Sequence, residues 1–331
     1  MAGLISSMMA GLGFGGEPGG KYKTAEIYTN LRQMVFTVSP EKLGLSPSAT
    51  NRVYGLLMET GYKDAAMTLV SLADGTVSLY FSNGGGYIGV GQHQGPRQAS
   101  DALLAAAPEY LSQAARVQSF PLPVQGNTRF YFLAFDGIYS TEVKEADLGN
   151  NKLLLSPLFF KAQDVITQLR LWDERRKGLL GAAARGEVPL IKKILELDPV
   201  LLDSKDDTGL TPLMAAAYSG QTDTVKFLLE VKALVGVKDK DGLTALMFAT
   251  NAGKLDCAKL LLDAGAGVNE PAHDGSTPIM FAAQHGFNDV VKLLLERGAD
   301  PTKTGKHGLS AVGFAKQHGL KETEKILLEK K

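Results

Sequence analysis

A 33-residue period runs through the second half of the sequence and constrains the fold more than any other feature. Four positions recur at this spacing in parallel series: Gly209, Gly242, Gly275 and Gly308; Thr211, Thr244, Thr277 and Ser310; Ala216, Ala249, Ala282 and Ala315; and Gly220, Gly253, Gly286 and Gly319. A fixed period of about 20–50 residues is typical of repeat proteins. One such unit cannot bury its apolar face alone, so we predict stacked units that share a continuous core.

The local sequence within each period predicts a turn followed by two short helices. Asp-Gly at 241–242 and 274–275 favours a tight turn, because glycine adopts positive φ without steric cost. Thr-Pro at 211–212 and 277–278 fits a helix start, with threonine as N-cap and proline at the first helical position. Small alanines let neighbouring helices approach closely, and leucine pairs at 228–229, 261–262 and 294–295 fill the layer between repeats.

The repeated segments resemble the ankyrin repeat family, whose motif is D-x-x-G-x-T-P-L-H-x-A-A-x-x-G followed by V-x-x-L-L. They read DDTGLTPLMAAAYSGQTDTVKFLLE, DKDGLTALMFATNAGKLDCAKLLLDAGAGVN, HDGSTPIMFAAQHGFNDVVKLLLERGADP and KHGLSAVGFAKQHGLKETEKILLEKK. An upstream copy, LLGAAARGEVPLIKKILELDP, lacks the Thr-Pro turn and is interpreted as an N-terminal cap. The resemblance implies an all-α solenoid of about five helix pairs: a cap over 174–205, repeats over 206–238, 239–271 and 272–304, and a C-cap over 305–331.

One position departs consistently from the family motif. Met214, Met247, Met280 and Gly313 stand where the family has the histidine of T-P-L-H. We therefore expect core packing between inner helices at these positions instead of a turn-bracing imidazole.

The first half carries no repeat and predicts an α+β domain over 24–173, after a flexible glycine-rich arm over 1–23. Apolar runs flank Ala73-Asp74-Gly75 and Asp136-Gly137, which are hairpin signals, and 84–86 predicts a further turn. Helices are predicted over 24–36, 48–61, 96–117 and from Ser156 onward. An antiparallel sheet with covering helices is the expected packing. The element order resembles roadblock and profilin-like domains, without a shared motif.

Composition narrows the class of function. The chain has 35 Lys and Arg against 35 Asp and Glu, divided as 13 against 14 before residue 174 and 22 against 21 after it. Neither half is basic, so we expect no nucleic-acid partner and no membrane surface as a partner. A single cysteine excludes a disulfide within the chain and multi-cysteine metal patterns, and the first 20 residues lack a secretory pattern, so we expect a cytoplasmic protein.

No catalytic, cofactor or metal site is predicted. Two G-x-G-x-x-G stretches, at 11–16 and 84–89, lack the strand–turn–helix context that binds a dinucleotide. Stacked histidines such as His285 and His318 belong to neighbouring repeats, too far apart to share one zinc ion. Cys257 stands at a position of its repeat that is expected to face inward, which indicates a core residue.

The family resemblance implies that a concave face of turn tips and inner helices binds a protein. Carried over by position, the face comprises Asp207, Thr208, Leu210, Tyr218, Ser219, Lys240, Asp241, Leu243, Asn251, His273, Asp274, Ser276, Gln284, His285, Lys306, His307, Leu309, Gln317 and His318.

The sequence thus favours a non-enzymatic interaction or scaffold protein. Its N-terminal domain would dimerise or bind a second partner. One alternative is a ligand-binding or enzymatic N-terminal domain around 83–97, with Asn83, Gln92, His93 and Arg97 as its polar groups. Another is a bacterial immunity or effector-type protein.

Overall fold

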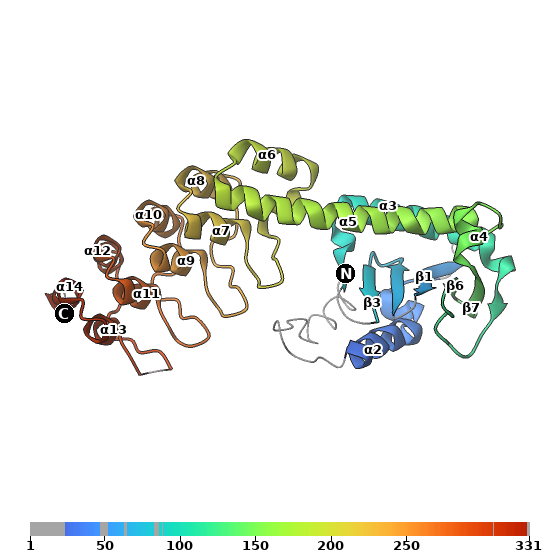
Figure 1. Cartoon of the computed structure of the whole chain (residues 1–331), viewed down its shortest axis with the longest axis horizontal. Helices are drawn as coiled ribbons and strands as arrows, with labels where there is room; N and C mark the ends of the chain where they lie inside the picture. The colour runs from blue at the N-terminus through green and yellow to red at the C-terminus, as the bar shows by residue number, and fades with distance from the viewer. Residues whose placement is uncertain are drawn as a thin grey trace. The chain divides into compact units, whose positions relative to one another are not determined.

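The computed structural model describes residues 24–46, 52–62, 65–82, 86–87, 89–306 and 308–329 (Figure 1). The chain divides into two compact units, Met1–Asp173 and Glu174–Lys331. The predicted arm over 1–23 lies outside the described residues.

The N-terminal unit is built on a seven-stranded sheet of order β4-β3-β2-β1-β6-β7-β5, in which every neighbouring pair is antiparallel. The predicted α+β class is therefore confirmed for this half. Its elements are α2 (Thr24–Thr37), η1 (Pro40–Leu43), β1 (Val53–Gly61), β2 (Ala66–Leu72), β3 (Val77–Phe81), β4 (Gly86–Tyr87), η2 (Val90–Gln92), α3 (Gln94–Ala106), η3 (Ala107–Gln113), β5 (Ala115–Arg116), β6 (Asn127–Ala134), β7 (Gly137–Lys144), α4 (Glu145–Gly149) and α5 (Ser156–Arg185).

Helices cover both faces of this sheet. Helix α2 lies on one face, and α3 and the long α5 lie on the other (Figure 1). On the α2 side, Leu31 and Val35 pack in one cluster with Leu57, Val70 and Leu133. Because both faces are covered, all nine residues of β1 are buried.

The prediction of a helix over 48–61 is wrong for the described part of that segment. Residues 53–61 form β1, the central strand, which pairs with β2 and β6. A strand buried on both faces reads as a continuous apolar run, without the polar alternation that marks a half-exposed strand. Because the alternation is missing, the segment was predicted as a helix instead of a strand.

The two predicted hairpin turns are confirmed. Strands β2 and β3 join through Asp74 and Gly75, where Gly75 has φ +95° and the Asp74 carboxylate accepts the Thr76 N–H at 2.8 Å. Strands β6 and β7 join at Asp136 and Gly137. The further predicted turn at 84–86 reaches the described residues only at Gly86, which begins β4.

The C-terminal unit is helical, as predicted, and its helices stack in pairs. After the end of α5 come α6 (Val188–Leu197), η4 (Pro199–Asp203), α7 (Pro212–Ser219), α8 (Thr222–Glu230), α9 (Ala245–Asn251), α10 (Leu255–Asp263), α11 (Pro278–His285), α12 (Asn288–Glu296), α13 (Ala311–Gln317) and α14 (Lys321–Glu329). We call α7, α9, α11 and α13 the inner helices and α8, α10, α12 and α14 the outer helices; each set forms one row in Figure 1.

Candidate partner-binding surface

The turn tips that precede the inner helices are linked to one another by backbone hydrogen bonds. Lys240 N–H donates to the Thr208 carbonyl at 3.0 Å, His273 N–H to the Asp241 carbonyl at 2.9 Å, and Lys306 N–H to the Asp274 carbonyl at 2.7 Å. The same bond therefore recurs between each pair of successive tips. These bonds fix the tip side chains of successive repeats relative to one another.

Aspartates brace the tips from within. The Asp206 carboxylate accepts backbone N–H groups from Thr208 at 2.8 Å and Leu210 at 2.9 Å, and Asp239 does the same for Asp241 and Leu243. Burial acts to raise the pKa of Asp206, but the hydrogen bonds from Thr208 and Leu210 outweigh it and hold that pKa below its usual range.

The predicted tip residues differ in how far they reach solvent. Asp207, Thr208, Lys240, Asp241, His273 and Lys306 are exposed, whereas Leu210, Leu243, Asp274 and Leu309 are half-buried. Ser276 is 8% exposed, and its hydroxyl donates to the Asp274 carboxylate at 2.9 Å. Ser276 thus supports the turn and is not part of the exposed surface. His307 lies outside the described residues.

The methionines confirm the expectation of core packing and add a capping role. Met214, Met247 and Met280 are each 1% exposed. The backbone N–H of Thr211 donates to the Met214 sulfur at 3.4 Å, and that of Thr277 donates to the Met280 sulfur at 3.4 Å. The thioether thus satisfies one backbone donor at the start of these helices.

The inner helices present a periodic surface. Tyr218, Asn251, Gln284 and Gln317 occupy equivalent positions 33 residues apart, and Tyr218 is 52% exposed. The sequence reasoning missed a second row, Phe248, Phe281 and Phe314, one helical turn earlier. The same 33-residue period carries it and could have revealed it. The Phe248 ring packs edge-to-face with Tyr218 at 6.2 Å between centroids.

Histidines join this surface near its C-terminal end. His285 Nε2 lies 3.1 Å from Asn251 Oδ1, and this contact links α11 to α9. The centroid of the His285 ring lies 5.6 Å from that of the Phe287 ring. His318 Nδ1 lies 3.0 Å from the Phe314 carbonyl. Ser219, the remaining predicted residue, is half-buried at the end of α7.

A separate groove of about 380 Å³ lies beside α6, η4 and α8. Its lining is apolar apart from Lys192 and Glu196, and the Lys192 ammonium sits 5.2 Å from the centroid of the Phe227 ring. The other lining residues are Leu195, Pro199, Leu202 and Val231. Such a lining lacks the convergent polar groups that orient a small-molecule ligand.

The described residues of the alternative site around 83–97 have different surroundings. Gln92 is exposed, whereas His93 is 2% exposed with its ring 5.0 Å from Trp172. Arg97 pairs with Asp101 at 3.0 Å. Asn83 lies outside the described residues. The three described groups thus point to different environments.

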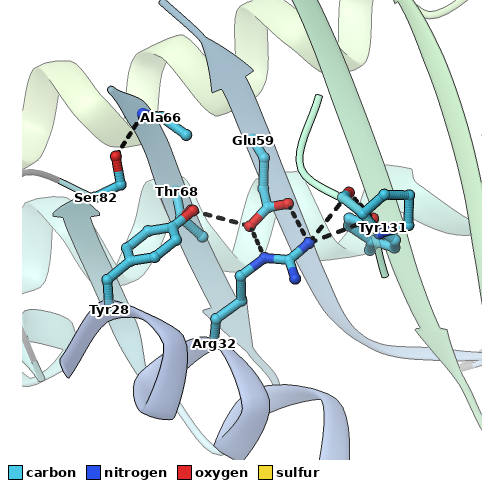
Figure 2. Close-up of polar contacts among 8 residues, drawn as sticks. Tyr28, Arg32, Glu59, Ala66, Thr68, Ser82 and Tyr131 are labelled. Atoms are coloured by element: carbon cyan, nitrogen blue, oxygen red, sulfur yellow. Dashed lines mark hydrogen bonds and ion pairs between the residues drawn. The ribbon is translucent and has the colours of Figure 1, made fainter. Parts of the chain in front are cut away.

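A polar cluster in the N-terminal unit connects α2 to the sheet (Figure 2). Glu59, fully buried on β1, accepts two hydrogen bonds from Arg32 at 2.7 and 2.8 Å and one from the Thr68 hydroxyl at 3.0 Å. Tyr28 bonds Thr68 at 2.8 Å, and Arg32 also reaches the hydroxyl of Tyr131.

This cluster also holds a loop. Tyr131 donates to the Pro121 carbonyl at 2.6 Å, and Phe120 stacks on Phe36 with centroids 4.2 Å apart. Every oxygen of Glu59 has a donor, so the cluster is a closed structural network that docks α2 and the loop at 120–124.

The described residues contain no group of three or more His, Cys, Asp or Glu placed to hold a metal ion. Cys257 is buried, and burial raises the pKa of its thiol, which disfavours the reactive thiolate. No helix among the described residues is long and apolar enough to cross a membrane.

The stacked helix pairs, linked tips and 33-residue period define a helical repeat solenoid. A family model described as ankyrin repeats (3 copies) matches residues 179–272, 230–305 and 266–331. The C-terminal half of the chain is thus an ankyrin repeat array, which is a protein–protein interaction module of a generally non-enzymatic family. The likeness of the N-terminal half to roadblock and profilin-like domains stays a prediction.

Proposed function

We propose that this chain is a non-enzymatic interaction protein whose ankyrin array binds a protein partner through the tips and inner helices. The surface of the inner helices carries the proposal. It combines an exposed tyrosine, half-buried phenylalanines and amide side chains, which is a composition suited to contact with another protein. The linked tips hold this surface in one shape, so little entropy is lost on binding.

The proposed role of the N-terminal domain is a second contact, either with another copy or with another partner. Three exposed apolar side chains support it: Tyr62 at 46%, Leu122 at 44% and Val124 at 63%. The last two belong to the loop that Arg32 and Tyr131 hold in place through Pro121. A held apolar loop is suited to contact with a partner because its conformation is fixed before binding.

The concave-face proposal is tested by affinity capture with the full chain and a triple variant, Tyr218→Ala, Asn251→Ala and Gln284→Ala. The matched control is Lys226→Ala, Lys259→Ala and Lys292→Ala, which changes exposed residues at the same period on outer helices. We expect the first variant to lose proteins that the chain and the control both retain. Retention of all of them by the first variant refutes the concave-face assignment.

The role of the N-terminal loop is tested by light scattering coupled to size exclusion and by the same capture. Val124→Asp places a charge on the exposed apolar loop and leaves the Pro121 carbonyl unchanged. We expect this variant to lose either self-association or a set of captured proteins that the Tyr218 triple variant keeps. If it loses neither, the loop is not the second contact.

A further inference from the structure

Two rows of side chains run along the inner helices in register. The aromatic row consists of Phe248, Phe281 and Phe314, and the amide row consists of Asn251, Gln284 and Gln317. Within each helix the two members are three residues apart, which places them side by side on one face. Each of α9, α11 and α13 therefore offers one phenyl ring and one primary amide.

One member of each row makes a contact with a neighbouring repeat. Tyr218 of α7 meets Phe248 of α9 edge-to-face, and Asn251 of α9 lies within hydrogen-bond distance of His285 of α11. Within the described residues, the side chains of Gln284 and Gln317 make no hydrogen bond. Their amides, half-buried and exposed respectively, are available to a partner.

Charge is nearly absent from this surface. The four inner helices contain one charged residue, Lys316, whereas each outer helix carries both acidic residues and lysine. A charged side chain laid on the inner helices would lose hydration without meeting an opposite charge. The middle of the bound segment is thus uncharged.

We propose that the two rows bind an extended partner segment in polyproline II conformation, with an apolar side chain at every third residue against the aromatic row. This proposal rests on the function proposed above and specifies its partner. Packed helices lie about 8–10 Å apart, and three residues of polyproline II span about 9 Å. Side chains on one face of a β-strand repeat at about 6.6 Å, which does not match.

The amide row distinguishes an extended segment from a helix. A helix with apolar residues seven apart would also match the spacing at about 10.5 Å. Its backbone N–H and C=O groups, however, are already paired within the helix, whereas a polyproline II segment leaves them free. Primary amides both donate and accept, so Asn251, Gln284 and Gln317 can bond the free main chain of the extended segment.

Opposite charges at the two ends of the array give the bound segment a direction. At the first tip, the Asp207 side chain is 98% exposed and lies 3.8 Å from Arg176. At the last repeat, Lys306 and Lys316 are exposed, and Lys316 lies 3.7 Å from Glu324. A basic residue of the partner thus lies near the first repeat and an acidic one near the last.

The test uses fluorescein-labelled peptides of about 14 residues, long enough to cross the inner helices at about three residues per repeat. One probe repeats Leu-Pro-Ser between charged ends, and its two versions carry Lys and Glu in opposite order. Two comparison probes place leucine at every second residue or at helical heptad spacing. Anisotropy titration against the full chain should show the Leu-Pro-Ser probe binding about tenfold more tightly than either comparison, with one charge order preferred.

Variants assign the binding to the two rows. Asn251→Ala, Gln284→Ala and Gln317→Ala together should weaken the Leu-Pro-Ser probe by about tenfold or more, since each lost hydrogen bond weakens binding by roughly twofold to tenfold. The lysine triple variant of the outer helices should bind as the unchanged chain does. Circular dichroism of each variant verifies that the array is folded.

The inference and the function beneath it can fail separately. If the heptad probe binds best, if no probe binds, or if the amide variant keeps full affinity, the extended-segment inference is overturned. In each of these cases the concave-face function still stands if the Tyr218 triple variant loses proteins that the control retains. If the Tyr218 triple variant and the control retain the same proteins, both the extended-segment inference and the concave-face function are overturned.

Discussion

At the scale of single residues, Glu59 is energetically costly, because it is a carboxylate buried in the middle of the sheet. Glu59 is fully buried, and its ion pair with Arg32 is 2.7 Å long. The attraction in such a pair offsets desolvation only when the geometry is good and the remaining oxygens are satisfied. Here Thr68 supplies the additional donor. The pair therefore specifies how α2 docks more than it stabilises the fold.

Glu59→Gln should lower the free energy of unfolding of the N-terminal unit by about 3 kcal/mol, because the Arg32 charge is left without its partner. Trp172, the only tryptophan of the chain, belongs to this unit and reports its unfolding in urea. The matched control is Lys152→Ala, which removes an exposed ion pair with Asp147 and should change the value by less than about 0.5 kcal/mol. If both substitutions lowered the unfolding free energy equally, the proposed role of Glu59 in docking α2 would be contradicted.

The tyrosine beside this pair predicts a dependence on alkaline pH. Burial, and then the nearby Glu59 charge, raises the pKa of Tyr28 to about 12 from the usual value near 10. The folded state thus holds this proton more tightly than the unfolded state. Its contribution to stability is complete below about pH 10 and is lost as the pH rises towards 12.

Tyr28→Phe should therefore make the fall in unfolding free energy between about pH 10 and about pH 12 less steep, although the variant loses its bond to Thr68. Urea titrations monitored by Trp172 across this pH range measure the slope. An unchanged slope in the variant would show that the Tyr28 proton is not the one that is lost.

At the scale of elements, periodic segments were predictable from sequence and the two-sided strand was not. Three of the four inner helices, α7, α9 and α13, begin with a side-chain cap. Their signals are local: in α7, Thr211 accepts the Met214 N–H, and Gly220 ends the helix at φ +76°. Strand β1 lacks such signals because burial on both faces removes the alternation. The aromatic row escaped for another reason. Phenylalanine on a short helix is usually interpreted as a core residue, and the 33-residue period of Phe248, Phe281 and Phe314 had to be combined with their position beside the amide row to indicate a surface.

Gly91 controls how the segment before α3 packs on the β2–β3 turn. A Cβ at this position would lie 1.5 Å from the Gly75 carbonyl oxygen, a backbone atom. Gly91→Ala should therefore force the two segments apart and destabilise the N-terminal unit by about 2 kcal/mol or more. Gly149→Ala is the control, since nothing lies within 4 Å of the added carbon. Thermal melts followed by Trp172 should show a clear loss only for the first variant.

At the scale of the whole molecule, two units have separate cores, and one helix contributes to both. Helix α5 buries Leu158 and Leu169 in the first unit and Leu179 and Ala182 in the second. The charge balance is likewise separate, since neither half has a net charge beyond one unit. The sequence predicted the class of each half, but it could not identify the N-terminal domain, whose sheet carries no motif.

Separate cores predict separate responses to a core change. Leu261 is fully buried in α10, so Leu261→Ala should destabilise the ankyrin array by about 3 kcal/mol through the lost burial and the cavity left behind. Most helix lies in this array, so circular dichroism at 222 nm follows it, whereas Trp172 follows the N-terminal unit. In urea, the dichroism midpoint should fall while the fluorescence midpoint stays within error of the unchanged chain. Equal shifts of both midpoints would show instead that α5 couples the two cores into a single cooperative unit, because a change in one core would then be felt by the other.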